Sequence, residues 1–379
     1  MKPIYLDYAA ATPMDAEVIK AMQPYFADKF YNPSATYLAG RGVRKDVESA
    51  RQSVAIQLGA RPAEVIFTAG ATEANNLAIQ GIMRGYPEGE VLVSAIEHES
   101  VLEPARLFKV KEIPVTPQGI VDLQKLEKLI TPKTVLVSVM LVNNELGTVQ
   151  PISEIAKILN KSSILRKNKR PLYLHTDAAQ AGNYLDLHVS RLGVDLMSIN
   201  SGKIYGPKQS GVLYVKAGTR LRPLIVGGGQ EFGWRSGTEN VAADIGLAKA
   251  LEIAQQKRAA ESKRILELRH FFEEGLKKMV PEPIINGAKN RRAPHVLSVT
   301  FPGVDNERLM MELDENAIQC AVGSACSASR QEASHVLSAI GLNDKQARST
   351  LRFSLGRFTT KKDIEKTLKS LSRLISANR

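Results

Sequence analysis

Short runs of apolar residues alternate with helical patterns over the first two thirds of the chain. The runs predict buried strands at Glu64–Thr68, Val91–Ala95, Val135–Leu141, Leu172–Asp177, Asp195–Asn200 and Val212–Val215. Between several of them, apolar residues at helical spacing predict helices at Asn75–Gly81, Val121–Leu129 and Ile152–Leu159. This alternation is typical of an α/β fold with a largely parallel sheet covered by helices.

The pattern changes in the last third. A long helical period over Val241–Met279 predicts a helix that bridges two domains. Strands and helices then follow in α+β order, at His295–Phe301, from Glu307, at Ala333–Ile340, at Thr350–Ser354 and in a final helix. In that helix Ile364, Leu368, Leu371 and Ile375 form one apolar face. We expect a large domain over residues 14–255 and a small one from residues 1–13 and 256–379.

The composition excludes several classes of protein. With 44% hydrophobic and 24% charged residues among 379, the chain is neither disordered, collagen-like nor a coiled coil. Two cysteines cannot build a disulfide framework, and six scattered histidines give no support for a metal site. No stretch approaches the roughly 20 apolar residues of a membrane span, and the N-terminus lacks an apolar signal core, so we expect a cytoplasmic protein without a membrane partner.

The net charge of +12 is distributed along the chain. Local excesses of basic residues occur in a polar segment near Lys161–Arg170 and in helical patterns that also contain glutamate. A solvated basic surface explains this distribution better than a dedicated nucleic-acid site, and it is compatible with an acidic protein partner. We expect no direct nucleic-acid binding.

The segment Thr68–Asn76 (TAGATEANN) leads from a strand into a helix that begins near Thr72. Backbone N–H groups at a helix start, together with the Thr72 hydroxyl, can bind a phosphate group. The alternative is an ordinary strand–turn–helix connection in which Thr72 caps the helix.

Two ionisable residues follow buried strands. Asp177 ends one strand, with Gln180 shortly after it, and a carboxylate at that position costs free energy unless it meets a cation. Lys203 follows the next strand among small residues, which suits a lysine that forms a Schiff base. The alternatives are an aspartate that caps the next segment and an ordinary surface lysine.

The two cysteines have different surroundings. Cys326 lies within VGSACSAS, where small neighbours predict an exposed and reactive thiol, whereas Cys320 in AIQCAV has the setting of a buried structural cysteine. A phosphate site, an acid, a lysine and a reactive cysteine together fit an enzyme that uses pyridoxal 5'-phosphate.

Many ordered motifs make the resemblance specific. The chain resembles the cysteine desulfurases, in the long-loop subgroup of aminotransferase class V. The matching segments are YLDYAAATP, NPS, GATEANNLAI, EH, VNNELGTVQPI, DAAQ, KIYGPK, GGGQE, RSGTEN, GSAC and RFSLGR. The resemblance implies pyridoxal phosphate fold type I, with a mostly parallel seven-stranded sheet in the large domain and a smaller α+β domain that carries the cysteine loop.

The resemblance also implies the cofactor site. Lys203 would carry pyridoxal 5'-phosphate covalently, His98 would stack on its ring and assist proton transfer, and Asp177 would keep its ring nitrogen protonated. The remaining cofactor contacts would come from Ala71, Thr72, Asn144, Gln180, Ser201 and, from the neighbouring subunit of a homodimer, Thr238.

For the substrate, the resemblance implies that Arg352 binds the carboxylate of L-cysteine, with Asn32 and Asn144 nearby. Cys326 would take the sulfur as a persulfide, leaving L-alanine, and pass it to an acceptor such as an iron–sulfur scaffold or a tRNA thiolation enzyme. Two other functions stay open: another pyridoxal phosphate lyase, such as a selenocysteine lyase, and a cofactor-poor sulfur carrier or interaction protein.

The chain departs from the family pattern at several positions. The residues Asn200-Ser201-Gly202-Lys203 stand where the family usually has Ser-Gly-His-Lys. Phe232 replaces a common arginine, and Tyr37 replaces a histidine that often follows NPS. These changes predict weaker cofactor binding rather than a different class of reaction.

Overall fold

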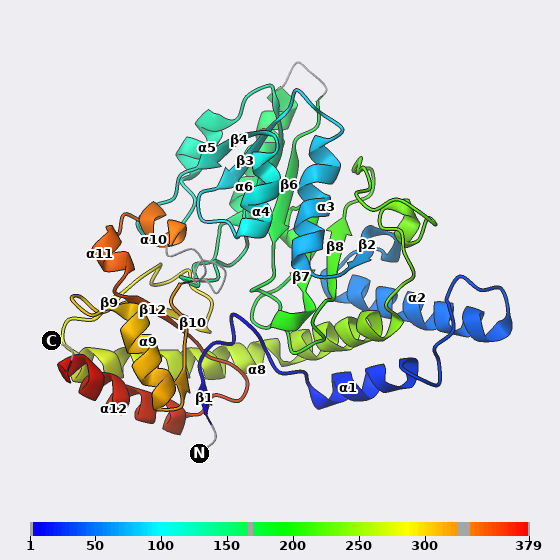
Figure 1. Ribbon diagram of the computed structural model, residues 1–379. Coiled ribbons are helices and arrows are strands. Elements are labelled where there is room, and N and C mark those ends of the chain that lie inside the picture. Colours follow the sequence, from blue (N-terminus) through cyan, green and yellow to red (C-terminus); the bar gives the residue numbers. More distant parts are fainter. Residues whose placement is uncertain (1–2, 166–169, 324–333, 378–379) are drawn as a thin grey trace.

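A seven-stranded sheet forms the centre of the large unit (Figure 1). Its strands, in spatial order, are β2 (Val65–Thr68), β8 (Gly211–Val215), β7 (Leu196–Asn200), β6 (Tyr173–Asp177), β5 (Thr134–Ser138), β3 (Glu90–Ser94) and β4 (Lys109–Ile113). Only β8 runs antiparallel to its neighbours β2 and β7, and the other pairs are parallel. The computed structural model describes residues 3–165, 170–323 and 334–377.

Helices cover both faces of this sheet. They are α1 (Ala16–Met22), α2 (Leu38–Leu58), α3 (Ala71–Met83), α4 (Glu99–Arg106), α5 (Leu123–Leu129), α6 (Ile152–Leu165) and α7 (Val189–Leu192). Because side chains alternate along a strand, Val65 and Phe67 of β2 join the core under α2 and α6, whereas Ile66 joins the core under α3 and α4. The sheet is therefore buried on both faces, which explains its nearly continuous apolar runs.

A second unit packs around the C-terminal half of α8 (Val241–Met279) (Figure 1). Its strands are β1 (Ile4–Tyr5), β9 (Ile284–Ile285), β10 (Val296–Thr300), β11 (Ile318–Gln319) and β12 (Thr350–Ser354), and its helices are α9 (Asn306–Glu315), α10 (His335–Ala339), α11 (Asp344–Ala347) and α12 (Lys361–Ala377). Leu251 of α8 belongs to the core of the first unit, and Ile265 and Phe272 belong to that of the second. The helix thus joins two cores; the domain limits given above stay a prediction.

The α/β class and the mostly parallel seven-stranded sheet are confirmed. Helix α8 has the predicted bounds, and Ile364, Leu368, Leu371 and Ile375 of α12 are all buried. Helix α2 was not predicted, because glycines and charged residues obscure its apolar period. Strand β4 was also missed, because it lies at the sheet edge and carries lysine and glutamate.

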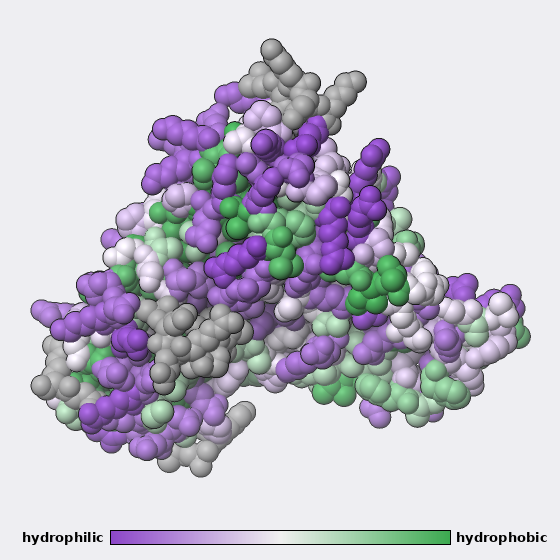
Figure 2. Space-filling view, turned by 45° about the horizontal axis from the view of Figure 1, so that its top comes forward, coloured by the Kyte–Doolittle hydropathy of each residue, from purple (hydrophilic) through white to green (hydrophobic). Residues whose placement is uncertain are grey.

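The surface is mostly polar, but apolar side chains gather where α1 and α2 lie (Figure 2). Phe26, Phe30, Tyr37 and Leu38 in this region are each more than half exposed. Val226 and Phe232 are exposed as well. Among the described residues, no helix is long and apolar enough to span a membrane.

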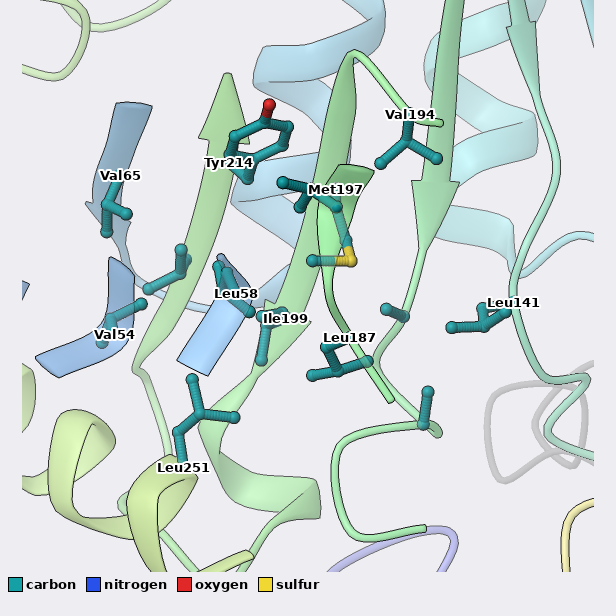
Figure 3. Packing of buried hydrophobic residues seen from close by; sticks show 14 of the residues in the cluster. Val54, Leu58, Val65, Leu141, Leu187, Val194, Met197, Ile199, Tyr214 and Leu251 are labelled. Atoms are coloured by element: carbon teal, nitrogen blue, oxygen red, sulfur yellow. The ribbon is translucent and has the colours of Figure 1, made fainter. Parts of the chain in front are cut away.

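The large core is closely packed between α2, α8 and the sheet (Figure 3). Val54 and Leu58 of α2 and Leu251 of α8 point toward Ile199 and its neighbours on β7 and β8. Helices α2 and α8 thus cover this face of the sheet, and they also pack against each other.

One charged pair lies inside this packed region. Arg51 of α2 is 3% exposed and donates to both carboxylate oxygens of Glu231 at 2.7 Å. Its guanidinium also donates to Val65 O at 2.8 Å and lies between the rings of Phe67 and Phe232, at 4.9 and 5.0 Å from their centroids. Phe232 has a φ of 60°, a strained value for a bulky side chain. The pair therefore anchors a strained segment to the sheet.

We predict that Arg51→Met lowers the free energy of unfolding by about 3–5 kcal/mol, because it leaves the Glu231 carboxylate buried without its cation. Urea denaturation followed by circular dichroism measures the change. Glu48→Ala is the control: Glu48 also contacts Arg51 but is 52% exposed, so its loss should cost about 1 kcal/mol or less. Equal effects of the two substitutions would contradict the prediction.

Candidate active site

A cavity of about 310 Å³ opens at the carboxyl ends of the parallel strands. Eight of the residues selected from the sequence line it, and they are Ala71, Thr72, His98, Asn144, Asp177, Gln180, Lys203 and Arg352. Ligands of open α/β sheets bind at this end because the connecting loops and helix starts meet there. The structure thus brings together residues that are far apart in the sequence.

Helix α3 begins at the cavity. Gly70 precedes it with φ 137° and ψ 176°, a conformation that suits glycine alone, and no side chain caps the helix. A Cβ on Gly211 of the neighbouring β8 would lie 2.6 Å from the Gly70 backbone, so both glycines allow the close approach of turn and sheet. The first N–H groups of α3, at Ala71 and Thr72, are therefore available for an anion.

Asp177 lies at the end of β6 and is 6% exposed. Its carboxylate accepts from Asn75 Nδ2 at 2.8 Å and from the Ala179 N–H at 2.9 Å. Burial raises the pKa of the neighbouring Glu97 well above its usual range, and the charge of Asp177 raises it further. Glu97 is fully buried and accepts from Met140 N–H at 2.6 Å. Of the two acids, the geometry supports Asp177 as the anion.

His98 caps the start of α4. Its Nδ1 accepts from the Ser100 N–H at 3.1 Å and lies 2.9 Å from Ser100 Oγ. An Nδ1 that accepts an N–H carries no proton itself, so the ring proton is on Nε2. The helix cap therefore fixes both the orientation and the tautomer of this imidazole.

Lys203 and Gln180 both contact the N-terminal segment that passes over the cavity. Lys203 Nζ donates to Ala10 O, and Gln180 Nε2 donates to Ala9 O at 2.9 Å. Gln180 Oε1 lies 3.3 Å from Nε2 of His295. Burial lowers the pKa of His295 to about 3, so this imidazole is neutral and its Nε2–H can donate to the amide. Both site residues are thus held by backbone and buried groups.

Arg352 comes from β12 of the second unit and is 2% exposed. It donates to Asp7 Oδ1 at 2.7 Å and to Asn144 O at 3.1 Å. Among the described residues, none accepts from its buried Nε. A buried cation with an unused donor, on the wall of a cavity, suits a bidentate contact with a small carboxylate.

Other predicted residues lie elsewhere. Ser201 Oγ is buried against Gly206 and does not line the cavity. Asn32 is exposed and accepts from Ser34 N–H at 2.8 Å, and Thr238 is exposed outside the cavity. Cys326 lies outside the described residues. The roles assigned to these four stay predictions, as do those of the eight residues that line the cavity.

The unusual residues before Lys203 have a clear local structure. Asn200 lines the cavity, and its Oδ1 accepts from the Gly202 N–H at 3.0 Å. A Cβ built on Gly202 would lie 3.5 Å from Asn200 Oδ1, an ordinary contact distance, and Gly202 has no positive φ. Tyr37 is exposed at the start of α2. The backbone at position 202 therefore does not require glycine.

The residues present fit pyridoxal 5'-phosphate. The start of α3 offers N–H donors for a phosphate, Asp177 offers a carboxylate for a protonated ring nitrogen, and Lys203 offers an amine. Arg352, a buried cation that lines the same cavity, offers a charge for a further anion.

Several residues of the site were not selected from the sequence. Asn75 donates to Asp177, and the Ser100 N–H donates to His98. Asp7 pairs with Arg352, and Glu97 accepts from the N–H of Met140 on the cavity wall. Asn75, Asp7 and Glu97 lie within the motifs TAGATEANN, YLDYAAATP and EH, which was the available signal. Their partners are distant in the chain, so a linear pattern could not reveal the contacts.

Comparisons with known proteins agree with this geometry. The family model for aminotransferase class-V matches residues 4–367. The cysteine desulfurase IscS of Dictyoglomus turgidum is 42% identical over 381 residues, covering 99% of this chain and 95% of the relative. A solved NifS-like protein shares 33% identity with a TM-score of 0.91, covering 99% of this chain and all of that one.

A further solved structure, SspA in complex with cysteine, is 34% identical with a TM-score of 0.82. The match covers 94% of this chain and all of that one. With a family model over nearly the whole length and full-length relatives well above 30% identity, the chain belongs to the aminotransferase class-V family, among relatives that are cysteine desulfurases.

Proposed function

We propose that this protein is a cysteine desulfurase that converts L-cysteine to L-alanine and transfers the sulfur through Cys326. The observation that carries the proposal is one cavity that joins Lys203, Asp177 and His98 with the incompletely bonded Arg352. The similarity to full-length cysteine desulfurases and to a structure in complex with cysteine supports the choice of substrate.

Pyridoxal 5'-phosphate, when bound, supplies an electron sink that weakens bonds at the substrate carbons. Ala71 and Thr72 would bind its phosphate through the start of α3, and Lys203 would hold it covalently. Asp177 would keep a proton on the ring nitrogen, and Gln180 and Asn144 would lie along its edge. His98, protonated at Nε2, would cover the ring.

Arg352 would bind the substrate carboxylate and so orient the rest of L-cysteine. The Lys203 amine would then take the proton from the substrate Cα. The thiolate of Cys326 would attack the substrate sulfur: an S–S bond forms, the C–S bond breaks, and its electron pair stays on the carbon. That carbon takes up a proton, the Cα regains the one it gave to Lys203, and the product leaves as L-alanine, while Cys326 keeps a persulfide.

The proposal includes a homodimer and a sulfur acceptor. The exposed apolar residues of α1 and α2, together with Val226 and Phe232, provide a surface for a second copy. Thr238 lies in the exposed segment after Phe232 and would complete the neighbouring cofactor site. The persulfide would pass to an acceptor protein for iron–sulfur cluster assembly or tRNA thiolation.

We predict that Lys203→Ala abolishes both the borohydride-reducible link between protein and cofactor and all L-alanine release, because Lys203 is the only lysine among the described residues that line the cavity. Absorbance spectra and alanine assays measure the two effects. Lys208→Ala is the matched control: Lys208 is exposed, does not line the cavity, and should be dispensable for both. A reducible link that survives in Lys203→Ala would disprove the assignment.

We predict that Gly202→His and Asn200→Ser each tighten cofactor binding, about ten- to a hundredfold where a charge-assisted hydrogen bond to phosphate is gained. A Cβ at position 202 would make no contact closer than 3.5 Å. Equilibrium dialysis measures the affinity for pyridoxal 5'-phosphate. Gly42→His, at an open position on the exposed face of α2, is the control. If neither variant changes the affinity for pyridoxal 5'-phosphate, the residues at positions 200 and 202 do not weaken cofactor binding.

We predict that Cys326→Ala binds the cofactor normally but loses persulfide formation and nearly all alanine production. Cys320→Ala should retain turnover, because burial raises the pKa of the Cys320 thiol to about 12 and keeps it from becoming a thiolate. Mass spectrometry after incubation with L-cysteine locates the added sulfur. Finding it on Cys320, or full turnover in Cys326→Ala, would favour a generic pyridoxal phosphate lyase instead.

A further inference from the structure

A continuous chain of hydrogen bonds runs from Asp177 to His98 beneath the cavity. Asn75 Nδ2 is 2.8 Å from Asp177 Oδ2 and also 2.8 Å from Ser100 Oγ. Ser100 Oγ is 2.9 Å from His98 Nδ1. Asn75 is fully buried on α3, and Ser100 is 9% exposed on α4. Three separate elements thus meet in one network.

The donors and acceptors along this chain are determined by its chemistry. An ionised carboxylate can only accept, so the Asn75 atom facing Asp177 is the amide nitrogen. Its second hydrogen then goes to Ser100 Oγ, which must accept. The Ser100 hydroxyl hydrogen is therefore left for His98 Nδ1, whose single lone pair is shared between this hydroxyl and the Ser100 backbone N–H at 3.1 Å. Every bond in the chain has one direction only.

Packing alone does not explain Asn75. Its Oδ1 is buried, and among the described residues it has no hydrogen-bond partner. A buried carbonyl oxygen without a partner costs free energy, so an apolar residue at this position would serve the fold better. What the amide contributes is its two N–H donors, which are directed at two residues of the site.

We propose that Asn75 is a positioning residue that couples Asp177 to His98. One –NH2 group orients the Asp177 carboxylate and, through the Ser100 hydroxyl, holds His98 with Nδ1 as the acceptor and the proton on Nε2. The inference deepens the proposed function, because it rests on the cofactor roles assigned to Asp177 and His98. Through this link, a change in the hydrogen bonding of Asp177 also affects His98, and the reverse.

The test compares Asn75→Ala, Ser100→Ala and the double variant in the cofactor-loaded protein. ¹⁵N NMR of labelled histidine reports the state of His98 Nδ1, assigned by its loss in His98→Gln. Equilibrium dialysis gives the affinity for pyridoxal 5'-phosphate. Asn286→Ala is the matched control, because Asn286 is also buried and its Nδ2 likewise donates to two side chains, the hydroxyls of Ser298 and Thr300 in the second unit.

Ser100→Ala should move the His98 Nδ1 resonance toward that of a less strongly bonded nitrogen and change cofactor affinity little. Asn75→Ala should move the same resonance and also weaken cofactor binding about ten- to a hundredfold, because Asp177 loses a donor. The double variant should move the resonance no further than Ser100→Ala alone. Asn286→Ala should change neither quantity.

An unchanged Nδ1 resonance in Asn75→Ala, or equal effects of Asn75→Ala and Asn286→Ala on both measurements, would overturn the proposal. If Asn75→Ala does not fold, Ser100→Ala still tests the link, since an unchanged His98 resonance in that variant breaks the chain. Neither measurement requires sulfur chemistry or Cys326. Failure of the desulfurase function would therefore appear separately, as missing persulfide in a protein whose His98 network is intact.

Discussion

The burial of a carboxylate at the end of β6 is the constraint around which the site is built. Asp177 is almost fully enclosed, and an unpaired charge there would be costly. The structure offsets this cost with the donors of Asn75 and Ala179. Burial raises the pKa of Glu97, the next buried acid, well above its usual range. The polar groups around the end of β6 are thus arranged around the charge of Asp177.

The second constraint is that the cavity wall comes from both units. Asp7 follows β1 and Asn144 follows β5, and the guanidinium of Arg352, from β12, bonds both. Helix α8 contributes to both cores, which fixes the units relative to each other. The unused Nε of Arg352 is therefore held at a defined place by contacts that span nearly the whole chain.

Much of the fold follows from local pattern, because a buried strand such as β5 has an apolar centre, Val135–Val137, and α12 has a clear apolar face. The same patterns place Asp177 and Lys203 at strand ends. They could not reveal the partners of these residues. The contact of Asn75 with Asp177 spans 102 positions and that of Arg51 with Glu231 spans 180, so they exist only after the chain has folded.

The two cysteines illustrate why a cysteine that acts as a nucleophile needs surroundings that do not bury its thiol. Cys320 packs against the second core, and both burial and the nearby Asp7 raise its pKa. Arg352 is close enough to oppose this effect but does not outweigh it. A thiol built next to a packed strand therefore stays protonated, even within reach of a cation. A cysteine that must attack as a thiolate has to lie outside such packing, and the polar segment around Cys326 meets that requirement in its composition.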